Sequence, residues 1–175
     1  MMKPLMGGPP WHGQYEALYR QHSARVVRLC SLWLDDRQEA QEVAQEVFLK
    51  LARRCQAQDR PTEWGAWLTR VTLNACRDRR RSGWWQRRSQ VIEDVEVVDS
   101  EPTPEREAIS REERERIWRA FRELPRRQRE VFVLRHLEGW STEDVALALG
   151  VTAGSVKRHL FRAIQRLRKV LGGHS

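Results

Sequence analysis

Cysteine is scarce in this chain, and long apolar runs are missing from it. The three cysteines among the 175 residues, Cys30, Cys55 and Cys76, are too few and too scattered to form a disulfide framework. No apolar run approaches the length of a membrane span, and residues 1–10 lack the apolar core of a signal peptide. We therefore expect a reduced, cytoplasmic protein that does not insert into a membrane.

Patterns typical of metal sites and of catalysis are missing too. No CxxC or HxxxH pair occurs, and the five histidines never lie near cysteine at the spacing of metal ligands. No nucleophile is paired with a base, and no phosphate-binding loop is present. The sequence therefore predicts a protein that is not an enzyme and that holds neither a metal nor a cofactor.

Strand-like alternation and internal repeats are also absent. Apolar residues instead recur at three- and four-residue steps along most of the chain, which is the spacing of amphipathic helices. The pattern predicts an all-α fold.

Positive charge is plentiful but unevenly distributed. The net charge is +8, and the isoelectric point is about 10.2. Residues 1–90 carry 16 basic and 9 acidic side chains, residues 91–115 carry 3 and 10, and residues 116–175 carry 13 and 5. This balance fits a nucleic-acid partner, although a basic ribosomal protein would share it.

The charge pattern divides the chain into two basic modules separated by an acidic stretch. That stretch contains Pro102 and Pro104, and proline together with like-charge repulsion keeps such a segment extended. We predict four parts, which are a disordered N-terminus at 1–13, a helical domain at 14–90, a flexible acidic linker at 91–115 and a second helical domain at 116–175.

The first domain begins with two predicted helices. The first carries an apolar stripe of Tyr15, Leu18, Tyr19, His22, Val26, Leu29, Cys30 and Trp33. The second begins near Asp36, and Glu39 follows three residues later as in a capping box. Its apolar stripe consists of Ala40, Val43, Ala44, Val47, Phe48 and Leu51. Neither helix could bury its stripe alone, so we expect the two to pack on each other.

A third helix, predicted from Pro61–Thr62 to about Arg81, carries two stripes. The apolar stripe contains Trp64, Trp67, Leu68, Val71 and Ala75, and the polar one contains Arg70, Asn74, Arg77 and Arg81. Tryptophans at this spacing are typical of a core, whereas arginines balanced only by Asp78 indicate a face turned to a polyanion. Further arginines and tryptophans follow at Arg79, Arg80, Trp84, Trp85, Arg87 and Arg88. Cations hold phosphates while aromatic rings stack on unpaired bases, so this helix suits opened DNA. The alternative is that the arginines form only a solvated face.

The second domain is predicted to end in a helix-turn-helix. Its elements are a helix from Leu124–Pro125 to Leu137 that ends at Gly139, a short helix Glu143–Leu149 capped by Ser141 or Thr142, and a last helix capped by Thr152 that runs to about Leu171. Ala146 is small enough for two helices to cross closely, Gly150 can adopt the left-handed turn, and Val156 can fill the angle between the helices.

The first turns of the last helix carry the side chains that such a helix presents to the major groove. These are Ser155, Lys157, Arg158, His159 and Arg162. The alternative is a helical hairpin that does not bind DNA.

Three segments together resemble the extracytoplasmic-function (ECF) group of sigma factors of bacterial RNA polymerase. They are Asp36–Leu51 (DRQEAQEVAQEVFLKL), Trp67–Arg81 (WLTRVTLNACRDRRR), and Leu124–Phe132 (LPRRQREVF) followed by Gly150–Lys157 (GVTAGSVK). They occur in the order and at the spacing of that family, and the resemblance extends over roughly residues 14 to 171.

The resemblance implies two helical domains that divide the work of promoter recognition. The first would dock on core RNA polymerase through the region of Asp36–Leu51, and would melt and read the minus-ten element of promoter DNA. The second would read the minus-thirty-five element and contact the polymerase flap. The family also commonly has an anti-sigma factor as a partner.

The resemblance also assigns residues. Together with the polar face opposite the apolar stripe of Asp36–Leu51, it indicates core polymerase binding at Glu39, Glu42, Gln45 and Glu46. Together with the polar stripe of the third helix, it indicates downstream recognition and melting at Trp67, Arg70, Asn74, Arg77 and Arg81. Asn74 matches a position that helps hold a flipped non-template base, and residues 58–63 match the loop that captures it. Upstream recognition would fall to Ser155, Lys157, Arg158, His159 and Arg162.

Two positions depart from the family pattern. The docking helix usually has an acidic pair where Gln41 and Glu42 stand, so its charge is weaker here. The usual Lys-Ser-Arg of the recognition helix reads Lys157-Arg158-His159, which bears on the upstream sequence that is read.

Two other classes of protein share some of these features. An operator-binding regulator could carry the same helix-turn-helix, although it usually dimerises or has a sensor domain, and it would bind duplex DNA without polymerase. An interaction protein, such as a polymerase-binding anti-activator, would not need basic side chains at Lys157, Arg158 and Arg162.

Overall fold

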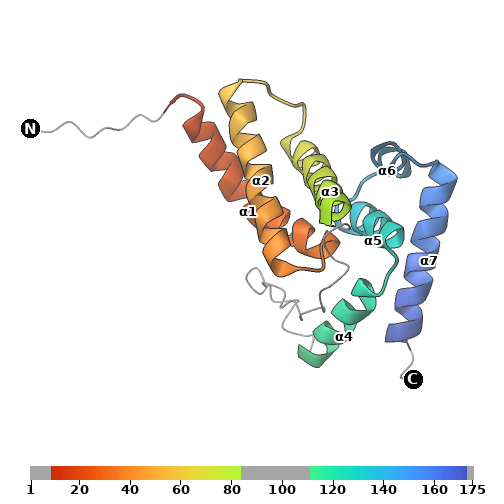
Figure 1. The fold of residues 1–175 in the computed structure, drawn as a ribbon. Helices are drawn as coiled ribbons and strands as arrows, with labels where there is room; N and C mark the ends of the chain where they lie inside the picture. Colours follow the sequence, from red (N-terminus) through yellow and green to blue (C-terminus); the bar gives the residue numbers. More distant parts are fainter. Residues whose placement is uncertain (1–8, 84–110, 173–175) are drawn as a thin grey trace, which may run out of the picture. The chain divides into compact units, whose positions relative to one another are not determined.

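The computed structural model describes residues 9–83 and 111–172, and every regular element in these ranges is a helix (Figure 1). The chain divides into two compact units, residues 1–98 and residues 99–175. The all-α prediction is confirmed. Most of the predicted linker, together with Trp84, Trp85, Arg87 and Arg88, lies outside the described residues.

Three helices form the first unit: α1 (His12–Trp33), α2 (Arg37–Gln56) and α3 (Trp64–Gly83). Each packs against the other two, as Figure 1 shows. The predicted cap of α2 is present, since the Asp36 carboxylate accepts a hydrogen bond from the backbone N–H of Glu39 at 2.8 Å. Helix α1 begins at His12, inside the segment 1–13 that the sequence had assigned to a disordered N-terminus.

The core of this unit is built from apolar side chains of all three helices. The residues with almost no exposed surface include Val26, Leu29, Trp33, Val43, Val47, Leu51, Leu68 and Leu73. Tyr15 and Tyr19, which the sequence placed on the apolar stripe of α1, are partly or largely exposed.

Helix α3 buries a wider arc than its predicted apolar stripe. Leu68 and Ala75 are buried as expected, whereas Trp64, Trp67 and Val71 are only half-buried. The additional buried residues are Thr69, Thr72, Leu73 and Cys76. The reason is that α3 contacts both α1 and α2, so that two faces are covered. The threonine hydroxyls are satisfied by carbonyls one turn earlier, Thr72 to Leu68 at 2.7 Å and Thr69 to Gly65 at 3.1 Å.

Four α-helices and a π-helical turn form the second unit. They are α4 (Arg111–Arg122), α5 (Arg126–Phe132), η1 (Val133–Leu137), α6 (Thr142–Leu149) and α7 (Ala153–Leu171). Helix α7 contacts α4, α5 and α6 and so organises the unit. Helix α4 begins at Arg111, within the range 91–115 that the sequence had assigned to the linker. Its first turns are highly charged, and the short apolar segment around Ala120 and Phe121 is buried. The charge made the start of this helix look like part of the linker in the sequence.

The helix-turn-helix of the second unit has the predicted caps and turn. Ser141 caps α6 by accepting from the N–H of Asp144 at 3.0 Å, and Thr152 caps α7 by accepting from the N–H of Ser155 at 3.2 Å. Gly150 ends α6 in the left-handed region, with φ 65°. Val156 is fully buried at the start of α7. These local contacts fix the direction of α7 relative to α6.

Candidate nucleic-acid interface

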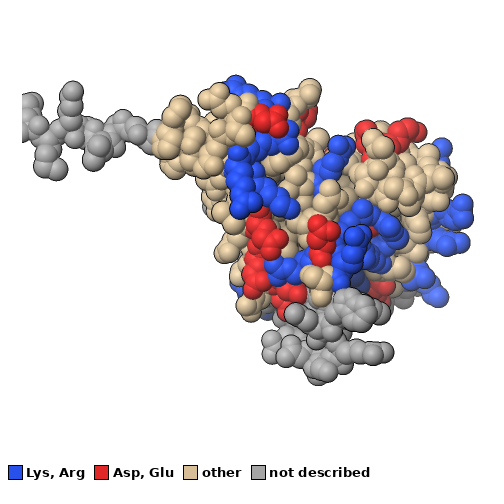
Figure 2. Space-filling model, turned by 45° about the horizontal axis from the view of Figure 1, so that its top comes forward, with Lys and Arg blue, Asp and Glu red and all other residues tan. Residues whose placement is uncertain are grey.

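The polar stripe of α3 reaches the surface of the first unit. Arg70, Asn74 and Arg81 are exposed, and Arg77 is half-buried. Because they recur at steps of four, three and four residues, they follow one side of the helix. Figure 2 shows many Lys and Arg side chains exposed on the face in view, interspersed with Asp and Glu. This side of α3 can therefore contact a polyanion along about three turns.

Trp67 lies at the edge of this stripe and is held by its neighbours. Its ring is perpendicular to that of Trp64, with centroids 5.7 Å apart. The guanidinium carbon of Arg54, at the end of α2, lies 4.9 Å from the centroid of Trp67. Both tryptophans are half-buried, so each has one part in the packing and another part at the surface.

The acidic face of α2 is bridged by an arginine of α3. Glu42, Gln45 and Glu46 are exposed as predicted, and Glu39 is half-buried. Arg79 donates from Nη1 to Glu42 Oε2 at 2.6 Å and from Nη2 to Glu46 Oε1 at 2.5 Å. The hydrogen bond from Arg79 lowers the pKa of Glu42, and the bond to Glu42 raises the pKa of Arg79. Sequence spacing does not predict this pairing, because Arg79 lies on a different helix from Glu42 and Glu46.

Leu49 is an exposed apolar residue beside these acids. Its side chain is 59% exposed, and it follows Gln45 by four residues and Glu46 by three, so the three share one face of α2. The sequence does contain a signal for it, since Leu49 falls outside the buried stripe of the helix. An apolar residue on the polar side of an amphipathic helix indicates a contact with another molecule.

The first turns of α7 present part of the predicted set. Lys157, Arg158 and Arg162 are exposed. Ser155 is half-buried, and its Oγ accepts a hydrogen bond from the Thr152 hydroxyl at 3.0 Å. His159 is also half-buried rather than exposed, and its Nδ1 is buried without a hydrogen-bond partner.

The position of His159 affects its charge. Burial lowers its pKa, and the charges of Arg162, Arg127 and Arg158 lower it further. The ring is therefore neutral at neutral pH and adds no positive charge to the exposed arginines around it.

Phe161 is a further exposed side chain that the sequence analysis missed. It is 62% exposed and lies three residues after Arg158, next to Arg162. The helical spacing of α7 defines an apolar stripe of Val156, Leu160, Ile164, Leu167 and Val170, and Phe161 falls outside it. An apolar side chain between two arginines can contact the methyl group of thymine in the major groove.

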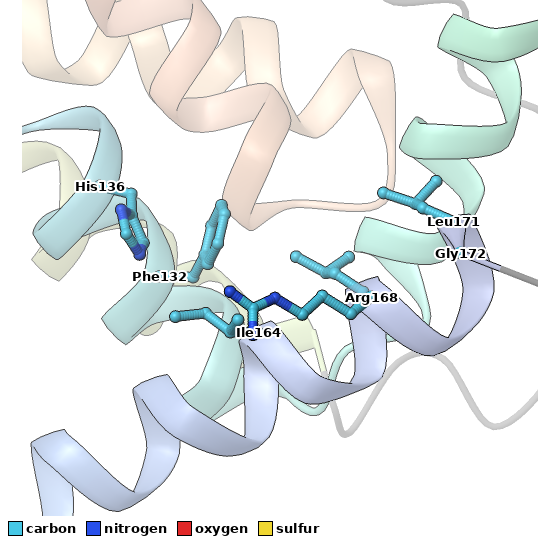
Figure 3. A pocket seen from close by; sticks show the side chains of 7 residues that line it. Phe132, His136, Ile164, Arg168, Leu171 and Gly172 are labelled. Atoms are coloured by element: carbon cyan, nitrogen blue, oxygen red, sulfur yellow. The ribbon is translucent and has the colours of Figure 1, made fainter.

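An apolar groove of about 620 Å³ lies between the end of α5 with η1 and the second half of α7. Figure 3 shows Phe132 and His136 on one side, facing Ile164 and Arg168 on the other. The lining is completed by Leu167, Leu171 and Gly172. The groove is on the second unit alone, and its lining on α7 begins at Ile164, two residues after the exposed Arg162.

Residues 9–83 and 111–172 contain neither a membrane-spanning helix nor a cluster of metal ligands. No helix there is long and apolar enough to cross a membrane. In the same residues, His, Cys, Asp and Glu side chains do not gather in threes as metal ligands would. The three cysteines are buried, and no disulfide joins them.

Two family models match the sequence, one on each unit. The model described as "Sigma-70 region 2" matches residues 18–86, and the model described as "Sigma-70, region 4" matches residues 114–167. Together these matches cover most of the chain and contain all the residues predicted to bind core polymerase or DNA.

Curated relatives match over nearly the whole chain. The chain is 31% identical over 159 residues to the RNA polymerase sigma-E factor of Streptomyces coelicolor, covering 90% of this chain and 86% of the relative. It is 30% identical over 158 residues to the ECF RNA polymerase sigma factor SigM of Mycobacterium tuberculosis, covering 90% and 77%. It is 32% identical to the ECF RNA polymerase sigma factor SigE of Mycolicibacterium smegmatis, but spans only 63% of that protein's length.

Solved structures of similar fold exist. The sigma factor RpoE of Bartonella quintana, in complex with the anti-sigma factor NepR, matches with a TM-score of 0.68 at 19% identity, covering 93% of this chain and 99% of that one. CnrH in complex with the cytosolic domain of CnrY matches with a TM-score of 0.60 at 21% identity, covering 94% and 91%. At this level of identity the likeness concerns the fold.

Proposed function

Because the chain belongs to the ECF group of the sigma-70 family, we propose that it binds core RNA polymerase, directs it to particular promoters and promotes melting of the promoter DNA. The observation that carries the proposal is that each matched sigma-70 region coincides with a helical unit that exposes a row of basic side chains. The two rows lie on α3 and on α7.

Helix α2 is the proposed docking element for core polymerase. Its exposed face carries Glu42, Gln45 and Glu46, with Glu39 at one end and Leu49 at the other. Carboxylates offer a basic partner charge-assisted hydrogen bonds, and an exposed leucine offers apolar area that is buried on contact. This mixed composition, acidic and amide groups beside an apolar side chain, suits a partner surface that is basic and partly apolar.

Helix α3 is the proposed element for the downstream, minus-ten-like sequence. Arg70, Arg77 and Arg81 can follow phosphates along one strand, and Asn74 between them can donate and accept hydrogen bonds at a single base edge. Trp67, held against Arg54, supplies an aromatic surface beside this row.

Helix α7 is the proposed reader of the upstream, minus-thirty-five-like sequence. Lys157, Arg158 and Arg162 are the exposed members of the predicted set, and Phe161 joins them. Ser155 and His159 are half-buried, so they support these exposed side chains and contact DNA only at the edge of the interface. The apolar groove between η1 and α7 is the proposed site for the polymerase flap.

The proposal also extends to partners and place of action. The sigma factor of known fold from Bartonella quintana is bound by an anti-sigma factor, and we assign a partner of that class to this chain too. Core polymerase and promoter DNA place its action in the cytoplasm. No step in the proposal requires catalysis, a metal or a cofactor of this chain.

Run-off transcription tests the proposal. Core RNA polymerase with this protein is given a DNA library in which the two promoter elements are randomised, and the transcribed templates are sequenced. We expect enriched sequences at both elements only when protein and core enzyme are present together. No enrichment with core enzyme would contradict the proposal.

A gel-shift assay on the enriched promoter separates the alternative. A sigma factor is expected to need core polymerase for specific binding, whereas an operator-binding regulator would bind the duplex alone. Specific binding by the isolated protein, without any transcript in the run-off assay, would support the regulator.

A further inference from the structure

Arg54, at the end of α2, connects the loop that follows α2 to the tryptophans of α3. Its Nη2 lies 2.8 Å from Asp59 Oδ2, and its Nε donates to the main-chain carbonyl of Asp59 at 3.2 Å. The Cζ of the same guanidinium group lies over the ring of Trp67, 4.9 Å from its centroid. One side chain therefore contacts the loop twice and α3 once.

The loop, residues 57–63, has a backbone that needs such support. Gln58 has φ 54°, and it is the non-glycine residue with positive φ among the residues that the structure describes. A side chain in this left-handed region costs free energy that the surrounding contacts must offset. Just after the end of α2, the backbone N–H of Gln58 donates to the carbonyl of Cys55 at 3.2 Å. The side-chain contact that follows in the loop is the one between Asp59 and Arg54.

The charge of Arg54 is already matched. Its guanidinium is 29% exposed and paired with the Asp59 carboxylate, which is 63% exposed. A cation that is paired in this way is a weaker phosphate contact, because the Asp59 carboxylate beside it offsets its charge. Its geometry, with a planar fork on the loop and a flat face on an indole, is instead that of a support.

We propose that Arg54 is a positioning residue that fixes the shape of loop 57–63 against Trp67, and thereby sets which unpaired base of the downstream element this loop accepts. The inference rests on the proposed function of α3 and adds a residue to it. The ligand is an extruded nucleobase of single-stranded DNA, which binds by stacking on flat groups and by hydrogen bonds at its edge. Arg54 does not touch the phosphates in this proposal.

Arginine and lysine are not equivalent at such a position. Arg54→Lys keeps the positive charge and can still reach the Asp59 carboxylate, but it loses the planar fork and the stack on Trp67. Asp59→Asn removes the charge of the loop partner and leaves the stack and the main-chain hydrogen bond in place. Arg53→Gln is the matched control, because Arg53 is the exposed neighbour on the same helix end.

The experiment is run-off selection by holoenzyme on a promoter library, both as duplex and with a pre-melted bubble over the downstream element. We expect Arg54→Lys to flatten the base preference at one or two downstream positions by roughly fivefold, the size of one lost cation–π contact. The loss is expected on the bubble template too, since the shape of the loop still matters once the strands are apart. Asp59→Asn is expected to show a smaller change at the same positions.

Three accompanying measurements decide the outcome. Core binding by competition, the unfolding temperature and the salt slope of promoter binding should stay near wild-type in Arg54→Lys, because no phosphate contact is lost. An unchanged base profile in Arg54→Lys would overturn the proposal, and so would an equal flattening by Arg53→Gln. If wild-type holoenzyme selects no downstream sequence at all, the proposed function of α3 fails and this inference fails with it.

Discussion

Arg79 of α3 donates a hydrogen bond to Glu46 of α2 over 2.5 Å, and it binds Glu42 one turn away at 2.6 Å. One arginine thus joins the helix proposed to dock on polymerase to the helix proposed to hold melted DNA. The pairing also reduces the net charge of the docking face, which already has Gln41 where the family usually has an acid. Variants at these acids therefore affect both the packing of α2 on α3 and any contact with polymerase.

The pair makes stability depend on pH. Arg79 lowers the folded-state pKa of Glu42 below its unfolded value of about 4.3. The stabilisation is therefore fully present above about pH 4.3 and is lost as the pH falls through the lower folded value. In thermal melts from neutral to acidic pH, Arg79→Gln should melt below wild-type at neutral pH, and the difference should shrink toward acid. The control is Arg20→Gln, at an exposed position of α1, which should follow wild-type at every pH. A melting-temperature difference between Arg79→Gln and wild-type that stays constant with pH would argue against the pair.

A charge swap separates folding from docking. Glu46→Arg places two arginines together and should lower both the unfolding temperature and the affinity for core polymerase. Adding Arg79→Glu restores an ion pair with position 46, although Glu42 then faces an acid, and the charge at position 46 of the α2 face stays reversed. We expect the double variant to regain part of the unfolding temperature without regaining core affinity. Recovery of both in a competition assay would remove Glu46 from the docking surface.

Leu49 gives a second test of the same surface. Because its side chain is 59% exposed in the free chain, Leu49→Ser should change stability by no more than about 0.5 kcal/mol. Burying the exposed part of this leucine on contact contributes about 1–2 kcal/mol, so core affinity should fall roughly five- to twentyfold. Lys50→Ser, at the exposed neighbour, is the control and should bind normally. Equal affinities for the two variants would show that Leu49 stays exposed in the complex.

The features that the sequence predicts well are local. The caps at Asp36, Ser141 and Thr152 and the left-handed Gly150 depend on residues a few positions apart, and all four are in place. The exposed stripe of α3 is also predicted, because helical spacing alone determines which side chains share a face.

The features that it does not predict depend on contacts between helices. Arg79 meets Glu42 and Glu46 only once α3 lies on α2, and Thr69, Thr72 and Cys76 are buried only because α3 touches two helices at once. His159 belongs to the same class, since its spacing fits an exposed position while packing in the second unit turns it partly inward. Helix α4 was missed for a different reason, since its charged first turns resemble the acidic segment before it.

The recognition helix offers a contrast between neighbours. Arg158 is exposed, and a bidentate contact from arginine to guanine provides about 1–3 kcal/mol of discrimination. Arg158→Ala should therefore relax the preference at particular upstream bases. His159→Ala removes a half-buried ring and should lower the unfolding temperature more than it changes the base preference. Selection on a library with a randomised upstream element reports both, and a uniform loss for all sequences in Arg158→Ala would indicate a phosphate contact instead.

The final prediction concerns Asn74, the polar side chain between two arginines of the α3 stripe. Asn74 is exposed, so its amide can meet a base edge without disturbing the core. Asn74→Ala should leave core binding and the closed complex nearly normal and should reduce the yield of open complex, because unstacking a base costs a few kcal/mol that its pocket must offset. A template with a pre-melted bubble already has the base extruded, so it should restore much of the activity.

The control for Asn74 is the unfolding temperature. If the side chain served only to stabilise the first unit, Asn74→Ala would melt earlier and the bubble would restore nothing. Arg81→Gln, at the exposed end of the same stripe, should instead weaken promoter binding on both templates and reduce its salt dependence, since an arginine beside DNA contacts phosphate rather than a base edge. Permanganate footprinting on duplex and bubble templates distinguishes the two patterns. Identical behaviour of the two variants would mean that α3 holds DNA by charge alone, with no base read at Asn74.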